Sequence, residues 1–290
     1  MAVGRKSILS RIVPGLRWRL NRRVRPYIAL VRSSVLWRLR HRRKRHRLPG
    51  ELIVSLTSYE PRFRTLAATL HCLLSQTIAA DRTILWISYK DEALLPPDVQ
   101  RLRKHQLEVR TTEDIGPYTK IIPVIRTFPN AFIVTADDDV YYEPLWLEKL
   151  VQNWDGRMNQ IVCHRAHKIS FDKQGCLRPY AQWLYETREP EESIAIFPTG
   201  VGGVLYPPGS LSTEVLDEIS FRELCPKADD IWLYWMGRRA GSSFKKIGGH
   251  QVLVHWPGSQ MVGLHRQNLG LGFNDQQIRN LAARFGYPEF

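Results

Sequence analysis

The sequence lacks several features that would assign a protein to a broad class at once. No run of about 18 uninterrupted apolar residues occurs, so no transmembrane helix is predicted. The four cysteines form no CxxC pair and have no ligand-like spacing with histidine, which favours a reduced, cytosolic protein. The N-terminus has no compact apolar segment followed by a small-residue cleavage site, and this argues against a secretory signal.

Acidic residues are also absent from the first part of the chain. The first 48 residues hold 16 of the 42 lysines and arginines and none of the 28 acidic residues. The remainder, with 26 basic and 28 acidic residues, is close to neutral. The formal charge of +14 therefore belongs to a basic arm, residues 1–48, and not to the domain of residues 49–290, which is long enough to bury a full core.

The basic arm contains a segment with helical periodicity. Ile28, Val31, Val35 and Leu39 recur at helical spacing among arginines, and Pro26 is expected to separate this helix from an earlier, similar segment. We expect the arm to bind an anionic membrane surface peripherally, at the inner face of the cell membrane. A disordered tail, a transit peptide and nucleic-acid binding are the alternatives, and nucleic acid is disfavoured because no base-reading module follows.

The domain begins with a regular alternation of two kinds of segment. Apolar runs at 52–59, 82–88, 107–112 and 131–136 predict strands, and the segments between them predict helices. Short intervals of this kind imply parallel pairing with right-handed crossovers, hence a Rossmann-like α/β half over about 51–154. Residues 155–290 are less regular, with one clear helix at 229–239, and we expect a single domain with a nucleotide half and a mixed acceptor half.

Polar residues follow the predicted strands. Ligands of an open parallel sheet bind outside the carboxyl ends of its strands. One crevice is therefore expected to be lined by the polar residues at those ends, namely Thr57, Ser58, Asp91, Asp114 and Asp137.

Three consecutive aspartates, Asp137, Asp138 and Asp139, stand at the end of the fourth predicted strand. Neighbouring carboxylates raise one another's pKa unless positive charge lies between them. Mg²⁺ or Mn²⁺ supplies such charge and prefers carboxylates together with substrate phosphates. The run therefore predicts a metal-bound diphosphate, while a solvated acidic turn that caps the following helix is the alternative.

The stretch FIVTADDDVYY resembles the DxD motif of GT-A-fold glycosyltransferases. Four further stretches resemble that family in order, and the resemblance covers about residues 51–270; they are IVSLTSYEPR, GPYTKIIP, PTGVGGVLYPPG and ADDIWLYW. This resemblance implies a GT-A-like fold. It also implies transfer of a sugar from a UDP- or GDP-sugar to a glycan or lipid-linked acceptor, as in bacterial surface-polysaccharide synthesis. Because no QxxRW signature and no membrane-spanning helices appear, single-sugar transfer is favoured over processive synthesis.

The resemblance also implies roles for individual residues of the donor site. Metal ligands would be Asp139, Asp137 and His255, with His250 and His265 as weaker candidates. The cofactor-binding set would border the nucleotide, with Arg62 near the diphosphate; it comprises Thr57, Ser58, Tyr59, Arg62, Asp91, Lys120, Asp137 and Asp138. Lys120 lies on a turn that enters a helix and would stabilise the leaving diphosphate, although an ordinary solvated lysine is the alternative.

Further candidates lie in the second half. Asp229 and Asp230 begin the predicted helix at 229–239, where they would either cap it or serve catalysis, Asp230 as general base in an inverting reaction and Asp229 as acceptor-orienting group. The stretch CHRAH, with His164, Arg165 and His167, is dense in cations and would contact an anionic group. The glycines of TGVGG, residues 199–203, would let the backbone approach a ligand closely.

Two other functions fit parts of the sequence. A metal-dependent nucleotidyltransferase would use similar aspartates, but it usually carries a glycine-rich loop after the first strand, which TSYEPRFR lacks. A non-enzymatic adaptor for membrane or nucleic acid would use the basic arm and keep a vestigial site.

Overall fold

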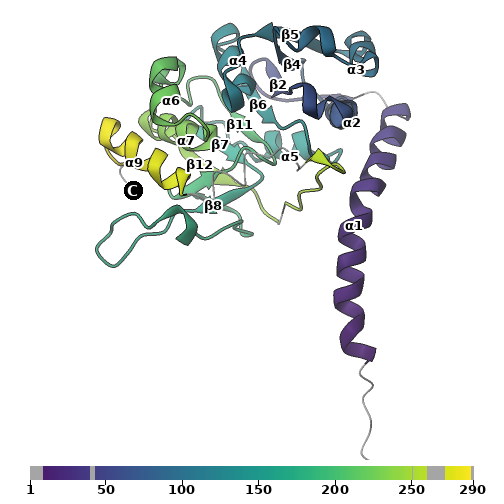
Figure 1. Ribbon diagram of the computed structural model, residues 1–290. Coiled ribbons are helices and arrows are strands. Elements are labelled where there is room, and N and C mark those ends of the chain that lie inside the picture. The colour runs from purple at the N-terminus through teal and green to yellow at the C-terminus, as the bar shows by residue number, and fades with distance from the viewer. Residues whose placement is uncertain (1–8, 40–42, 250, 260–271, 289–290) are drawn as a thin grey trace, which may run out of the picture.

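The computed structural model describes residues 9–39, 43–249, 251–259 and 272–288 (Figure 1). Residues 1–8 and 40–42 of the predicted arm, His250 and His265 lie outside these residues. The helices are α1 (Leu9–Arg38), α2 (Phe63–Leu73), α3 (Pro97–Arg101), α4 (Ile122–Thr127), α5 (Trp146–Asn153), α6 (Glu218–Leu224), α7 (Asp229–Arg239) and α9 (Phe273–Phe285). The strands are β1 (Lys44–Arg45), β2 (Leu52–Thr57), β3 (Ile78–Ala79), β4 (Arg82–Ser88), β5 (Leu107–Thr112), β6 (Phe132–Ala136), β7 (Gln160–Cys163), β8 (Ala166–Lys168), β9 (Glu191–Ser193), β10 (Ile196–Pro198), β11 (Val204–Tyr206) and β12 (Ser243–Lys246).

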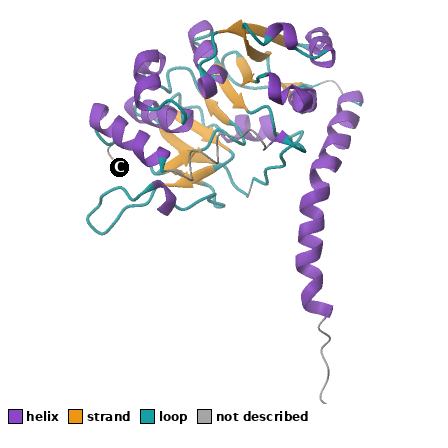
Figure 2. Cartoon of the chain, viewed as in Figure 1, coloured by secondary structure: helices purple, strands orange, loops and turns teal. Residues whose placement is uncertain are grey.

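One eight-stranded sheet runs through the domain in the order β5-β4-β2-β6-β11-β7-β12-β9. The strands β5, β4, β2 and β6 are parallel to one another. Beyond them β11 runs antiparallel to both β6 and β7, while β12 is parallel to β7. This mixed sheet with helices around it confirms the predicted α/β class, and it joins the two predicted halves into one layer (Figure 2).

Both faces of the central strands are buried, which explains their continuous apolar character. Leu52, Val54 and Leu56 of β2 point to one side, where they share a core with α2 and α5. Ile53 points to the other side and joins a second core that includes residues of α4, α7 and α9. Helices therefore cover both faces of the sheet, and its strand ends are where a sheet of this kind binds a ligand.

The N-terminal arm differs from its prediction in one respect. Helix α1 runs without interruption from Leu9 to Arg38, so the predicted separation at Pro26 is wrong. A proline in a helix interior costs roughly 3 kcal/mol through a lost hydrogen bond and a steric clash. Packing of the following turns on the domain, where Ala29 and Ser33 are buried, offsets part of this cost. None of the helices in the described ranges is long and apolar enough to cross a membrane.

The second half contains more helix than the sequence predicted. Helices α6 and α9 accompany the predicted α7, and both were missed. Helix α9 buries only a few of its side chains, among them Ile278 and Leu281. So weak an apolar pattern is not distinguishable from a polar loop by periodicity alone.

Candidate active site

The candidate site lies at the carboxyl ends of β2 and β6. The chain places β4 on one side of β2 and β6 on the other, so the strand order reverses at β2. A crevice forms at such a switch point because the connections leave in opposite directions. Parallel register pairs Leu56 with Ala136, so the residues that follow each strand emerge side by side. Ser58 and the aspartate run are thereby brought together, as the sequence predicted.

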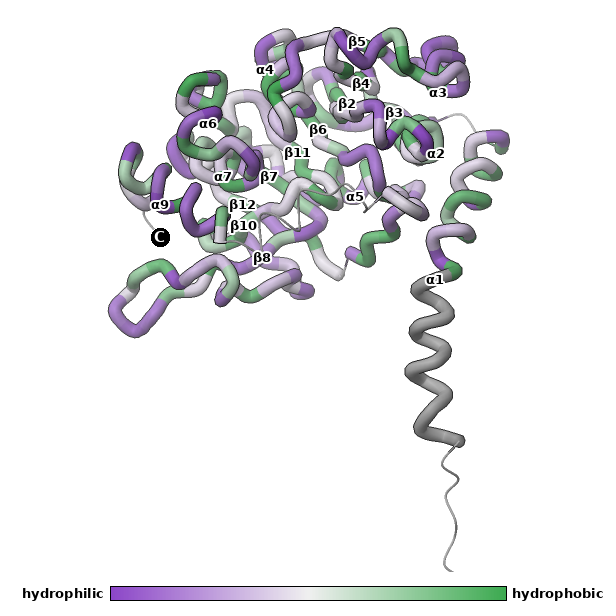
Figure 3. The backbone as a smooth tube through the Cα atoms, in the orientation of Figure 1, coloured by the Kyte–Doolittle hydropathy of each residue, from purple (hydrophilic) through white to green (hydrophobic). Residues whose placement is uncertain are grey.

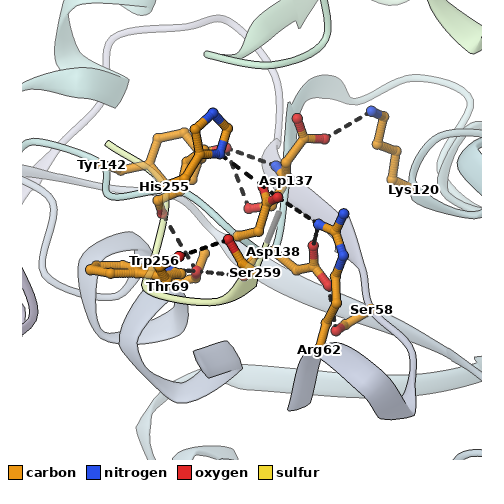
Figure 4. A network of polar contacts seen from close by, with 12 residues as sticks. Ser58, Arg62, Thr69, Lys120, Asp137, Asp138, Tyr142, His255, Trp256 and Ser259 are labelled. Atoms are coloured by element: carbon orange, nitrogen blue, oxygen red, sulfur yellow. Dashed lines mark hydrogen bonds and ion pairs between the residues drawn. The ribbon is translucent and has the colours of Figure 1, made fainter. Parts of the chain in front are cut away.

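Arg62 lies between two of the strand-end acids. Its Nη1 donates to Asp138 Oδ1 at 2.8 Å and lies 2.7 Å from Asp139 Oδ2. Ser58 Oγ donates to Asp138 Oδ2 at 2.6 Å (Figure 4). We call Ser58, Arg62, Asp138, Asp139 and His255 the Arg62 cluster. The positive charge that adjacent carboxylates require is thus supplied here by the protein itself.

The two acids of the Arg62 cluster differ in pKa. Burial raises the pKa of Asp138 to about 6, even though Arg62 and Ser58 favour its ionised form. Burial also acts to raise the pKa of Asp139, but hydrogen bonds and charges of His255 and Arg62 outweigh it and lower that pKa. Asp139 is therefore the more acidic of the two and keeps its negative charge to lower pH than Asp138 does.

His255 is held beside Asp139 by backbone contacts. It forms an isolated antiparallel bridge with Val140, and Trp256 N donates to Asp139 O at 3.0 Å. Trp256 Nε1 donates to Thr69 Oγ1 at 2.6 Å, and Thr69 Oγ1 donates to Asp138 O at 2.7 Å. These contacts bring His255 Nδ1 to 3.8 Å from Asp139 Oδ2.

A second cluster forms around Lys120, which is buried in a 3-10 turn, Gly116–Lys120. Its Nζ lies 2.9 Å from Asp137 Oδ1 and 3.1 Å from Asp229 Oδ2. Ser55 Oγ of β2 donates to Lys120 O at 2.6 Å and fixes the turn to the sheet. The solvated-lysine alternative is therefore wrong, and Figure 4 shows Asp137 turned toward Lys120.

Neither Asp229 nor Asp230 caps the helix that it begins. The N-cap residue of α7 is Ala228, without a side-chain hydrogen bond. Asp230 Oδ1 instead accepts a hydrogen bond from Gly200 N at 2.8 Å. The strand-end acids likewise leave α5 uncapped, because Leu145 occupies its N-cap position without a side-chain bond. The capping alternatives of both acidic motifs are therefore wrong.

A side chain at Gly200 would displace the groups of this contact. A Cβ at this position would lie 2.7 Å from Asp230 Oδ1 and 3.0 Å from Lys120 Nζ. Gly203 has φ +102° and packs so tightly that a Cβ would lie 2.5 Å from the Trp146 ring. The TGVGG loop thus lies against Asp230, to which Gly200 donates its backbone N–H. We call this group of residues the Lys120 cluster; it comprises Lys120, Asp137, Asp229, Asp230 and Gly200.

The Lys120 cluster contains three carboxyl groups and only one ammonium group, so negative charge is in excess when all three acids are ionised. Burial acts to lower the pKa of Lys120, but Asp137, Asp229 and Asp230 raise it well above its usual value. Burial and mutual repulsion raise the pKa of Asp229, and they raise that of Asp230 to about 7 despite Lys120. Asp230 keeps part of its surface accessible although protein atoms surround it closely. It is therefore an accessible carboxylate that exchanges its proton near neutral pH.

Other predicted residues lie at the strand-end edge but outside both clusters. Tyr59 is 37% exposed, with the Arg62 guanidinium 5.7 Å from its ring centre. Thr57 Oγ1 donates to Trp86 O at 2.9 Å. Asp91 accepts from Ser88 Oγ within its own loop, and the exposed Asp114 pairs with Lys90. No contact brings Asp91 or Asp114 to the two clusters.

The prediction for the stretch CHRAH needs correction. His164 is buried with Nε2 2.9 Å from Trp146 O, and burial lowers its pKa to about 4, so it is neutral at pH 7. His167 is buried too, and its Nδ1 accepts from Glu186 N. Arg165 is mostly buried and pairs with Glu186 at 2.6 Å. These residues are structural supports and do not form a cationic surface.

Some contributors were not visible in the sequence. Thr69 and Trp256, which hold the His255 segment, carry no motif that would single them out. The hydrogen bond from Gly200 N to Asp230 was also missed, although the glycines of TGVGG signalled a close approach.

A metal ion fits the Arg62 cluster only with further ligands from a substrate. No group of three or more His, Cys, Asp or Glu side chains able to hold a metal occurs in the part of the chain that the structure describes. Asp139 and His255 are near enough to serve as two ligands of one ion, whereas Asp137 is engaged by Lys120. Mg²⁺ and Mn²⁺ sites with one or two protein ligands are completed by phosphate oxygens and water.

Comparison with known proteins shows no matching family model and no match among curated proteins. Among solved structures, 4-diphosphocytidyl-2C-methyl-D-erythritol synthase from Anaerococcus prevotii superposes with TM-score 0.46 and 12% identity, over 73% of this chain and 92% of that one. GalNAc-T7, solved with UDP, GalNAc and Mn²⁺, superposes with TM-score 0.44 and 10% identity, over 80% of this chain and 47% of that one. The chain thus spans about half the length of GalNAc-T7. At such low identity, the chemistry of this site has to be derived from its own residues.

Proposed function

We propose that this chain is a metal-dependent glycosyltransferase that moves one sugar from a UDP- or GDP-sugar to a glycan or lipid-linked acceptor. One observation carries the proposal: Asp230, with a pKa of about 7, lies beside Lys120 and the strand-end acids at the switch point of the sheet. A base and an anion-binding group are thus combined where an α/β sheet binds its ligand.

The donor would occupy the Arg62 side of the crevice. Tyr59 offers a partly exposed ring for stacking on a base, and Arg62 offers a guanidinium for the diphosphate. Asp139 and His255 would hold the metal. That ion, when bound, would neutralise charge that develops on the departing diphosphate.

The acceptor would approach from the Lys120 cluster. Asp230 accepts the proton of the acceptor hydroxyl as that oxygen attacks the anomeric carbon and the bond to the nucleoside diphosphate breaks. A base works best when its pKa is close to the working pH, as that of Asp230 is. Lys120 stabilises the charge left on the phosphate side, and Asp229 would orient the acceptor. Direct attack with a single base implies inversion at the anomeric carbon.

The segment after β2 disfavours a nucleotidyltransferase. Residues Glu60–Arg62 form a 3-10 turn that contains Pro61 and no glycine, so backbone amides are not gathered into a phosphate-binding loop. The biological setting that we propose is synthesis of bacterial surface polysaccharide at the inner face of the cell membrane. The basic arm and the family resemblance support this setting.

Donor binding and product analysis test the proposal. Screening UDP- and GDP-sugars with and without Mn²⁺ should find a donor that raises Tm by about 5 °C when saturating, and only with the metal. Turnover should release nucleoside diphosphate. Asp139→Asn should abolish Mn²⁺-dependent binding and turnover, while Asp114→Asn, at the exposed end of a neighbouring strand, should change neither. Release of pyrophosphate, or full turnover by Asp139→Asn, would overturn the proposal.

A further inference from the structure

Helix α1 presents two apolar faces, of which the domain covers one. Counting 100° per residue, Ala29, Ser33 and Trp37 lie on one side of the helix. Ala29 and Ser33 are buried there, and the Trp37 ring stacks on His71 of α2 with centroids 4.9 Å apart. This inward face attaches the helix to the domain.

The opposite side of the helix carries a row of large apolar residues. Ile28, Val31 and Val35 are 58%, 65% and 43% exposed, and Val24, Tyr27 and Leu39 extend the row. Soluble surfaces carry single apolar residues commonly, but six on one helical face form a continuous stripe. We call these six residues the outward face. Figure 3 shows hydrophobic and hydrophilic residues interleaved along the described part of α1.

The positive charge around the outward face favours an anionic binding partner. At 100° per residue, Arg25 and Arg32 lie along one edge of it and Arg38 lies within it near the other edge, and all three residues are exposed. The first 48 residues contain no acidic side chain. An apolar stripe with arginines along it matches the boundary of an anionic bilayer, where acyl chains take the apolar side chains and headgroups take the guanidinium groups.

We propose that the outward face of α1 binds an anionic lipid bilayer while the inward face stays docked on the domain. Figure 1 shows the helix standing beside the domain, with only its last turns close to α2. Unlike a flexible basic tail, a docked helix holds the domain in one orientation to the membrane. The guanidinium of Arg32 lies 5.8 Å from the ring centre of Tyr141, which is a second contact between the helix and the domain. This inference deepens the proposed membrane setting by naming the surface that binds, and it does not depend on the proposed sugar transfer.

Vesicle flotation with the full chain tests this inference. The natural protein should float with vesicles of phosphatidylglycerol and phosphatidylcholine at 150 mM salt, and far less with phosphatidylcholine alone. A triple variant, Ile28→Ser, Val31→Ser and Val35→Ser, keeps every charge and should partition at least tenfold more weakly. A control variant with the same chemical change at exposed residues elsewhere, Leu94→Ser, Leu145→Ser and Ile219→Ser, should bind as the natural protein does.

Three outcomes would overturn the inference. The triple variant floating as well as the natural protein would show that charge alone binds the vesicle. A dimer that the triple variant dissociates, without vesicle binding by either protein, would assign the outward face to a second copy. Binding of duplex RNA that is tighter than vesicle binding and unchanged in the triple variant would assign the arm to nucleic acid. Circular dichroism would verify that all variants are folded.

Discussion

The Arg62 cluster and the Lys120 cluster each set one internal cation among aspartates, but they leave those aspartates in different states. In the Arg62 cluster two acids share the cation, and the pKa of Asp139 is lowered. In the Lys120 cluster three acids surround it, and the pKa of Asp230 rises to about 7. The ratio of acids to cations, together with burial, therefore leaves Asp139 of the strand-end run as an ionised carboxylate and makes Asp230 of α7 a proton acceptor near neutral pH.

Replacing Lys120 should have the largest effect, because it leaves the Lys120 cluster with negative charge only. Lys120→Met should lower the free energy of unfolding by about 3–5 kcal/mol, the usual cost of removing one partner from a buried ion pair. Urea denaturation at pH 7.5 would measure it. Lys90→Met, which removes a lysine from the exposed pair with Asp114, should leave the midpoint unchanged. An equal midpoint for both variants would contradict the burial of the Lys120 cluster.

Replacing Asp230 should remove the base and leave donor binding intact. Asp230→Asn should lower kcat by about 100- to 1,000-fold, a usual contribution of a positioned base. The natural enzyme's rate should rise with pH and level off above about 7, because the base must be deprotonated. A steady-state pH profile and donor titration would measure both effects. Unchanged kcat with a raised KM would move Asp230 from catalysis to acceptor binding.

The same substitution should have the opposite effect on stability. The folded-state pKa of Asp230 is raised, so its contribution to stability is complete below about pH 4 and is lost as pH rises to about 7. Asp230→Asn should therefore stabilise the protein at pH 8 by roughly 1–2 kcal/mol, less than the full pKa shift because solvent reaches the side chain. The gain should fade toward pH 5. Thermal unfolding at both pH values would measure it, and a gain that grows at low pH would reverse the assigned sign.

Replacing Arg62 should have the smallest effect and should sharpen the contrast between the clusters. Arg62→Gln removes a positive charge 2.7 Å from Asp139, so Mn²⁺ should bind about fivefold more tightly in the absence of nucleotide. Isothermal titration with Mn²⁺ alone would measure this change. Lys90→Met serves as a control for general charge, and unchanged Mn²⁺ affinity in Arg62→Gln would separate the metal from the Arg62 cluster.

Much of the nucleotide half was predictable because the patterns that indicate its strands lie within short stretches of the sequence. The apolar runs of β2, β4 and β6 are continuous, since both faces of these strands are buried, whereas the edge strand β5 is only half-buried. The acids at strand ends followed from the geometry of parallel sheets. Helix α9 was missed because few of its side chains are buried, and the continuity of α1 through Pro26 was missed because docking on α2 outweighs a local signal.

The partners of the acids were not predictable to the same degree. The sequence suggested a metal as counter-charge for the aspartate run, yet Arg62 takes that place from 76 positions away. His164 looked like part of a cationic stretch, but burial makes it neutral. The protonation of His164 depends on the side chains that pack around it in the folded protein. The residues next to it in the sequence do not reveal which side chains these are.

The sequence by itself determined the parallel β/α order, the placing of carboxylates at the ends of strands and the concentration of positive charge in the first 48 residues. The tertiary structure decided which cation each carboxylate meets, which acid keeps its proton near neutral pH and which face of α1 is covered. The physical reason is the separation along the chain over which each kind of interaction acts. Apolar periodicity acts over a few residues, whereas an ion pair forms across 3 Å between groups that only the folded chain brings together.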